Sequence, residues 1–269
     1  MKLESSYLDI GYLDFLARRK SFIHQLDPRA KLLTTLVFIA VVVSFGKYSV
    51  TGLIPFVIYP VSLMALGNLP PGYLFKKILV AAPFALFIGI FNPVLDREIM
   101  VRLGHVGISG GWISFASIMI RFFLTVSAAL ILIASTGFNE ICLALRKMGM
   151  PAGLSVQLLF LVRYLFVLIE EASRMNRARA VRSFDGKGMG MKVFSHMIGQ
   201  LLLRTIDRAR RIHLGMLCRG FDGELRLLRP FRLNSRDLAF ILGWSVLFVL
   251  MRRHDVPRLI GDLVLRMTG

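Results

Sequence analysis

Long apolar blocks separated by short polar connections run through most of this chain. The blocks cover residues 32–46, 51–67, 78–95, 112–136 and 238–251. A helix that crosses a bilayer needs roughly 20 apolar residues, within a range of about 17–25, so the first two blocks and the last must borrow flanking residues. The pattern predicts an all-α integral membrane protein with about five transmembrane helices.

A different pattern lies between the fourth and the last block. The apolar stretch Val156–Ile169 is only about 14 residues long, which is typical of a buried or interfacial helix. It leads into an arginine-rich helix that ends near Arg182. A second helix is predicted from Met191 to about Arg219, because its apolar residues recur at steps of three and four. The sequence therefore predicts a basic helical domain inserted before the last span.

A basic and apolar composition fits two classes of protein, a nucleic-acid-binding protein and a membrane protein with basic loops. The net charge is +18, hydrophobic residues make up 55% and the mean hydropathy is +0.65. A basic nucleic-acid-binding domain would be polar, with apolar residues confined to its core. The long apolar blocks favour a membrane protein instead, and we expect no nucleic-acid partner.

Basic residues also orient the chain in the membrane. They cluster before the first block, between blocks two and three, and after block four, and cytoplasmic loops carry such an excess. We predict a cytoplasmic N-terminal segment (1–31), a four-helix membrane part (32–136), a cytoplasmic helical domain (137–234), and a last transmembrane helix with a C-terminal tail (235–269). The basic group Arg252-Arg253-His254 then falls outside, against the rule.

Several charged residues lie beside or inside the apolar blocks. Asp27 is predicted to cap a helix whose first residue is Pro28. Arg29 and Lys31 are either cytoplasmic anchors or functional residues. Arg121 lies inside the fourth block, where a charge is costly unless it faces protein or water. It is either functional or pairs within the helix bundle, and we favour the second.

A pentapeptide occurs twice in the second half of the chain. Arg182-Ser183-Phe184-Asp185-Gly186 returns as Arg219-Gly220-Phe221-Asp222-Gly223, at an offset of 219 − 182 = 37 residues. Ala172 and Arg174 match Ala209 and Arg211 at the same offset. Two copies are too few for a solenoid, which needs at least about three repeats. We interpret them as two equivalent helix ends that contact two equivalent sites on a partner.

The residue types in the repeat indicate a contact surface. Arginine can bind a carboxylate through two parallel hydrogen bonds, and a small residue after it allows close approach to another backbone. Phe184 and Phe221 would add an apolar anchor beside each arginine, and Asp185 and Asp222 complete the supporting interface. Alternatively, Arg182 and Arg219 are ordinary basic residues of a cytoplasmic loop.

Motifs for catalysis or cofactor binding are not found in the sequence. There is no G-x-x-x-x-G-K-[ST] loop, and the five histidines are not at metal-ligand spacing with another His, Cys or acid. Cys142 and Cys218 are expected to be inert thiols. We expect a non-enzymatic chain that carries no metal and no cofactor of its own.

These residues resemble the transmembrane (T) component of energy-coupling factor (ECF) importers, most closely the CbiQ type of cobalt importers. The resemblance rests on Val181-Arg182-Ser183 and Cys218-Arg219-Gly220, and on Leu26-Asp27-Pro28-Arg29-Ala30-Lys31-Leu32 before the first span. The family usually carries Ala-Arg-Gly in the two motifs. This chain keeps the arginine and the small residue that follows it, but not the leading alanine.

The resemblance implies partners and a mechanism. Two cytoplasmic ATPase subunits (CbiO-like) would bind ATP and receive the helices that end at Arg182 and Arg219, which makes 137–234 the coupling-helix domain. Their closure would move these helices and reorient a separate substrate-binding membrane subunit (CbiM-like, with or without a small CbiN-like subunit). The complex would lie in the cytoplasmic (inner) membrane. Cobalt uptake, as for cobalamin biosynthesis, is implied, with nickel or a vitamin as the open alternatives.

Two functions of other classes are weighed against this interpretation. A stand-alone secondary transporter would place polar residues at mid-membrane and repeat its spans; here only Arg121 fits. A membrane enzyme acting on lipid headgroups would have to use Asp185 and Asp222.

Overall fold

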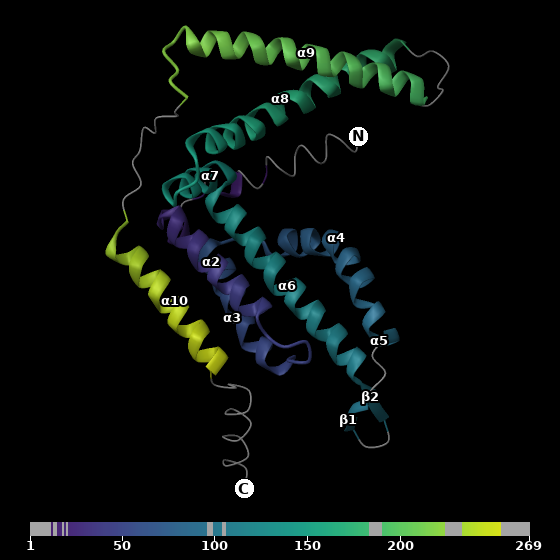
Figure 1. The fold of residues 1–269 in the computed structure, drawn as a ribbon, viewed down its shortest axis with the longest axis vertical. Helices are drawn as coiled ribbons and strands as arrows, with labels where there is room; N and C mark the ends of the chain where they lie inside the picture. Colours follow the sequence, from purple (N-terminus) through teal and green to yellow (C-terminus); the bar gives the residue numbers. More distant parts are fainter. Residues whose placement is uncertain are drawn as a thin grey trace. The chain divides into compact units, whose positions relative to one another are not determined.

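The computed structural model describes residues 12, 15–17, 19, 21–95, 99–103, 106–182, 190–223 and 233–253. Helices make up nearly all of this described part (Figure 1). The chain divides into two compact units. We call residues 14–141 with 231–269 the bundle unit, and residues 1–13 with 142–230 the hairpin unit. The all-α membrane fold predicted from the apolar pattern is confirmed.

The elements of the bundle unit follow the apolar blocks closely. In chain order they are η1 (Ile23–Gln25), α2 (Pro28–Val43), η2 (Thr51–Val57), α3 (Ile58–Gly67), α4 (Pro71–Gly89), α5 (Phe91–Leu95), β1 (Ile99–Leu103), β2 (Val106–Ser109), α6 (Gly110–Thr136) and α10 (Ser235–Arg253). The second block is divided between η2 and α3, and Pro55 lies inside η2. The antiparallel pair β1–β2 lies where we predicted a loop between blocks three and four.

Helix α6 is the centre of the bundle unit and packs against α2, α3, α4 and α5, while α10 packs against α2. Aromatic rings fill the space between α2, η2, α3 and α10. The ring centroids of Phe38 and Tyr59 are 4.5 Å apart, those of Tyr59 and Trp244 are 4.9 Å apart, and those of Phe38 and Phe248 are 5.3 Å apart. This cluster joins α10 to the first two apolar blocks.

A buried polar cluster joins the start of α2, the start of α10 and the end of α6. Asp27 caps α2 as predicted, since its side chain accepts from the Arg29 amide at 2.9 Å. The Asp27 amide donates to Asp237 Oδ1 at 2.9 Å, and Lys31 Nζ donates to the Ser135 carbonyl at 3.0 Å. Lys31 is only 3% exposed. It is therefore a packed residue of the bundle unit rather than a solvated anchor.

Two arginines bind backbone carbonyls at and just beyond the opposite end of α2. Arg121 donates to the Gly46 carbonyl, and Arg252 lies 3.4 Å from the carbonyls of both Val41 and Ser44. The last carbonyls of a helix have no partner within the helix. Arg121 thus behaves as the pairing residue that we favoured. Arg252, which the predicted topology places outside, binds backbone carbonyls of the bundle unit.

Within the described residues, three helical segments are long and apolar enough to cross a membrane: Pro71–Pro93, Gly110–Thr136 and Ala152–Arg182. The first covers residues 78–93 of the third predicted block, and the second contains the fourth. The third differs from the sequence prediction, because the short apolar stretch and the arginine-rich stretch form one continuous helix, α8 (Ala152–Arg182). No glycine or proline interrupts residues 170–182, and Glu170 and Glu171 both pair with Arg174 one turn later.

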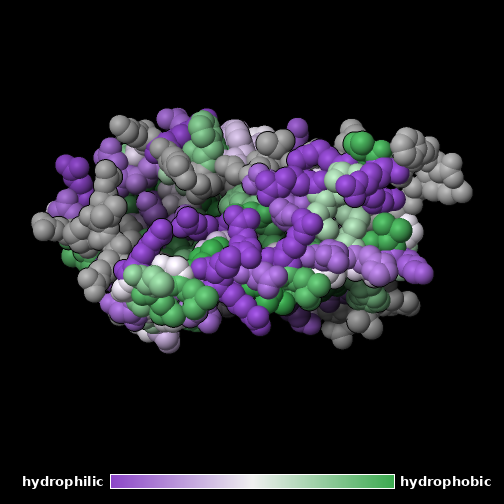
Figure 2. All heavy atoms as spheres, turned by 90° about the horizontal axis from the view of Figure 1, so that it is seen from above, coloured by the Kyte–Doolittle hydropathy of each residue, from purple (hydrophilic) through white to green (hydrophobic). Residues whose placement is uncertain are grey.

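The hairpin unit contains α8 and α9 (Met191–Leu217), and α7 (Phe138–Lys147) precedes them in the chain. α8 and α9 run antiparallel, since Glu171 contacts Arg204 while Phe160, nearer the start of α8, contacts Phe221 beyond the end of α9. No residue of α9 is fully buried. Figure 2, which views the molecule from the top of Figure 1, shows hydrophilic side chains in a band beside hydrophobic patches.

Candidate functional site

The first predicted contact point lies at the end of α8. Arg182 is the last residue of that helix and is exposed, and Val181 before it is 80% exposed. Within the described residues, the Arg182 side chain has no ion-pair or hydrogen-bond partner. Its guanidinium is therefore available to a carboxylate from outside. Ser183, Phe184, Asp185 and Gly186, the rest of this copy, lie outside the described residues.

The second contact point is the C-terminus of α9, and here the structure shows why a small residue follows the arginine. Gly220 has φ +76°, the Phe221 amide donates to the Met216 carbonyl, and the Gly220 amide donates to the Leu217 carbonyl, both at 3.0 Å. This bond pair is a Schellman cap, which needs a residue in the left-handed conformation, usually glycine. The small residue thus terminates the helix in addition to any role in close approach.

The cap leaves the arginine of the second copy on the surface. Cys218 and Arg219 are both exposed, and Cys218 is a free thiol. In the part of the chain that the structure describes, the Arg219 side chain has no hydrogen-bond or ion-pair partner. The two arginines of the repeat therefore share one local environment: each is an exposed cation at the C-terminal end of a long helix.

The aromatic residue of the second copy has a partner inside the hairpin unit. Phe221 is half-buried, with its ring centroid 6.4 Å from that of Phe160 in α8. It therefore fastens the end of α9 to the start of α8, which the prediction of an outward apolar anchor did not include. Asp222 next to it is exposed. The contact of Phe221 with Phe160 could not be predicted from the sequence, because it depends on the antiparallel pairing of α8 and α9.

The two contact points lie at opposite ends of the α8–α9 pair. Arg219 is next to the Phe160 end of α8, and Arg182 follows 22 positions after Phe160 in the same helix. At 1.5 Å per residue, that is about 33 Å along the helix axis. Two cations at this separation cannot bind one small anion together. The geometry fits two separate contacts, each with its own partner surface.

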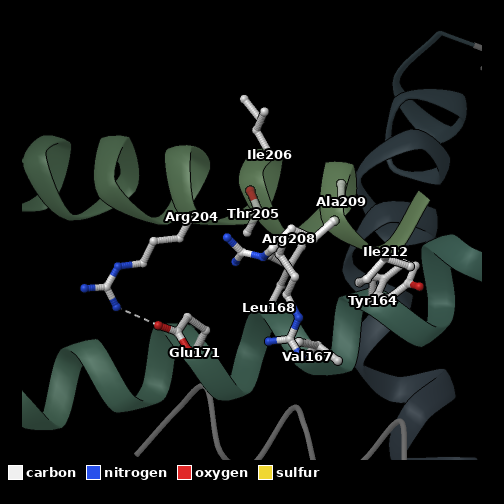
Figure 3. Close-up of a pocket in the computed structure, with 11 residues that line it drawn as sticks. Tyr164, Val167, Leu168, Glu171, Arg204, Thr205, Ile206, Arg208, Ala209 and Ile212 are labelled. Atoms are coloured by element: carbon white, nitrogen blue, oxygen red, sulfur yellow. Dashed lines mark hydrogen bonds and ion pairs between the residues drawn. The ribbon is translucent and has the colours of Figure 1, made fainter. Parts of the chain in front are cut away.

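A groove between α8 and α9 is a second candidate site, which the sequence did not reveal. It has a cavity volume of about 470 Å³ and is lined by Tyr164, Leu168, Arg204, Arg208, Arg211 and Ile212 among other residues. In Figure 3, Glu171 on α8 reaches toward Arg204 on α9, and their atoms Oε1 and Nη1 are 2.8 Å apart. The groove combines an apolar wall with a cationic edge.

His24 is a titratable side chain of the bundle unit that lies before the first apolar block and has a shifted pKa. His24 lies in η1, its Nε2 donates to the Leu16 carbonyl at 3.0 Å, and its Nδ1 is 2.7 Å from Ser21 Oγ. Burial, and next the positive charge of Lys31, lower the pKa of His24 below its ordinary 6.5.

Among the described residues, no group of three or more His, Cys, Asp or Glu side chains could hold a metal ion.

One protein-family model matches most of the chain. The model of the CbiQ family, described as "Cobalt transport protein", matches residues 19–228. This range contains both copies of the repeat, the capped start of α2 and the groove between α8 and α9.

Two curated relatives match most of the chain, and a third matches a shorter part at higher identity. An uncharacterized protein of Methanocaldococcus jannaschii is 26% identical over 91% of this chain and 86% of that protein. The energy-coupling factor transporter transmembrane protein EcfT of Bacillus subtilis is 23% identical over 86% of this chain and 93% of its own length. The cobalt transport protein CbiQ of Rhodobacter capsulatus is 33% identical, over 36% of this chain and 40% of that protein.

Proposed function

Because this chain belongs to the CbiQ family of cobalt transport proteins, we propose that it is the transmembrane component of an ECF importer and couples ATPase motion to transport. It is an integral membrane protein, and two of the relatives above are named as transport proteins. The observation that supports the coupling role is the repeated arginine. Each copy is exposed at the C-terminal end of a helix, and the two helix ends are separated by about 33 Å along the axis of α8.

In the proposed mechanism each arginine contacts one of two ATPase subunits. Arg182 at the end of α8 and Arg219 at the end of α9 would each pair with a carboxylate, with the flanking Val181, Ser183, Cys218 and Gly220 close to the partner surface. An arginine–carboxylate pair with two parallel hydrogen bonds fixes orientation as well as distance. When the two ATPases close on ATP, the two helix ends would be displaced relative to one another.

The displacement would reach the membrane through α8. This helix carries both an apolar stretch and an arginine-rich stretch without a break, so a force at Arg182 acts on the membrane-associated half as one rigid rod. We propose that the arginine-rich half is cytoplasmic and that the domain 137–234 is the coupling-helix domain. A contact that differs between two ATPase states is what such coupling requires.

The other members of the complex follow from the family. We propose two CbiO-like ATPase subunits that bind the ATP and a CbiM-like substrate-binding subunit, with or without a CbiN-like subunit, in the cytoplasmic membrane. This chain would neither hydrolyse ATP nor bind the substrate. Cobalt is the proposed substrate because the matching family and the Rhodobacter capsulatus relative are both named for cobalt transport.

The test is a double charge reversal, Arg182→Glu with Arg219→Glu, in cells that produce the whole importer. We expect loss of cobalt uptake and of co-purifying ATPase, with normal membrane insertion. The matched control is Lys192→Glu with Arg210→Glu, which makes the same charge change at exposed α9 positions outside the repeat. Uptake that persists in the first variant, or is lost equally in both, would contradict the coupling role.

A further inference from the structure

The groove between α8 and α9 is not used by the proposed coupling contacts. Its apolar wall comes from both helices, with Tyr164, Val167 and Leu168 on α8 and Ile212 on α9 (Figure 3). Its volume of about 470 Å³ lies within the range of about 300–1,000 Å³ that is typical of small-molecule sites. An occupant of this wall must be at least partly apolar.

The edge of the groove carries an excess of positive charge. Three arginines line it, Arg204, Arg208 and Arg211, against the single acid Glu171. Glu171 is already paired at 2.8 Å with Arg204 and at 2.8 Å with Arg174. Among the described residues, Arg208 and Arg211 have no ion-pair or hydrogen-bond partner. The groove therefore presents two unpaired guanidinium groups beside an apolar wall, which favours an amphiphilic anion.

The position of the groove along α8 indicates where such an anion would come from. α8 is apolar from Leu154 to Ile169 except for Ser155, Gln157 and Arg163, and it becomes charged at Glu170. It is also long and apolar enough to cross a membrane. The groove spans this change of polarity, since Leu168 and Glu171 both line it. A helix that leaves a bilayer changes from apolar to charged at the level of the lipid phosphates.

We propose that this groove binds an anionic phospholipid. Arg208 and Arg211 hold the phosphate, since arginine presents the fixed fork of donors that matches phosphate oxygens. An acyl chain lies along Val167, Leu168 and Ile212. The site would fasten α9, none of whose residues is fully buried, to the membrane surface.

The experiment titrates the detergent-solubilised full chain with dioleoyl phosphatidylglycerol or dioleoyl phosphatidylcholine and counts bound lipid by native mass spectrometry. Phosphatidylglycerol should bind the wild type more tightly than phosphatidylcholine. Each basic residue near an anionic surface contributes about fivefold, so Arg208→Gln with Arg211→Gln should weaken phosphatidylglycerol binding about 30-fold. The matched control, Lys192→Gln with Arg210→Gln, removes the same charge from α9 positions that do not line the groove and should leave affinity within about twofold.

Three results would overturn the proposal. An equal loss in both double variants would show that only general basic charge attracts the lipid. Displacement of the lipid by equimolar inorganic phosphate or deacylated headgroup would show a plain anion site. Unchanged lipid binding with loss of a co-purifying protein would assign these arginines to a protein interface. The proposed coupling role is tested separately, because the Arg208/Arg211 variant keeps Arg182 and Arg219 and should still retain its ATPase subunits.

Discussion

Replacing Lys31 with methionine should destabilise the bundle unit by about 3 kcal/mol. The Lys31 side chain is 3% exposed, and its ammonium donates to the Ser135 carbonyl at 3.0 Å. It is also attracted by Glu140, Asp27 and Asp237, of which Asp27 and Asp237 are buried. Methionine fills a similar volume, so the change removes charge and hydrogen bonding rather than packing.

The magnitude follows from the partners that remain. A hydrogen bond from a charged group contributes about 1.5–3 kcal/mol. Removing one member of a buried charged group costs about 3–5 kcal/mol, because the other charges stay buried without compensation. The lower end applies here, since Asp27 and Asp237 keep backbone donors at Arg29 and Asn234.

The assay is equilibrium unfolding in mixed micelles with rising sodium dodecyl sulfate, followed by tryptophan fluorescence. Trp244 packs against Tyr59 in the aromatic cluster, with ring centroids 4.9 Å apart, and so reports on the bundle unit. The control is Lys76→Met at an exposed position of α4, where we expect a change within about 0.5 kcal/mol. Adding Asp237→Asn to Lys31→Met should cost less than the sum of the two single changes.

A loss for Lys31→Met that matches the Lys76→Met control would refute this reasoning. Lys31 would then act only as a cytoplasmic anchoring charge, which is the alternative that the sequence left open.

Three further changes test other parts of the structure. Gly220→Ala should cost about 1–2 kcal/mol because alanine is strained at φ +76°. Gly215→Ala within α9 should instead stabilise by up to about 1 kcal/mol, because an added Cβ there meets no atom within 4 Å. Thermal unfolding of the two variants compares these effects. Gly89→Ala should cost about 1–3 kcal/mol, because the new Cβ would lie 2.8 Å from the Phe115 ring, whereas Gly72→Ala in the same helix should not destabilise; a melting temperature equal in both would contradict this packing. The pKa of His24 in the folded chain is below 6.5, so the unfolded chain binds more protons as the pH falls, and stability should fall as the pH drops below about 6.5. The melting temperature of His24→Gln should therefore depend less on pH than that of the wild type. An equal pH dependence in both would show that His24 is not the cause.

The sequence predicted most of the bundle unit because its signals are local. The apolar blocks, the Asp27 cap before Pro28 and the start of the last helix near Ser235 each depend on neighbouring residues, and the structure shows all of them. The partners of Lys31 and Arg252 could not be predicted in this way. Those contacts join residues that lie 104 and more than 200 positions apart in the chain.

The hairpin unit shows a different limit of sequence reasoning. The repeat located Arg182 and Arg219 at two helix ends, and both lie there. Hydropathy alone separated Val156–Ile169 from the arginine-rich stretch, although no helix-breaking residue lies between them and α8 is continuous. The groove and the contact of Phe221 with Phe160 depend on how α8 and α9 pair, which no periodicity within either helix specifies.

The most direct test of the central claim is site-specific photo-crosslinking in membranes that contain the whole importer. A photoreactive residue would replace Arg182 in one chain, Arg219 in a second and both in a third, with position 210 as the exposed control. The account predicts an ATPase adduct from each single position, two ATPase copies on the double chain and none from position 210. Adducts without ATPase at both arginine positions, or a single ATPase copy on the double chain, would contradict the claim that each helix end contacts its own ATPase subunit.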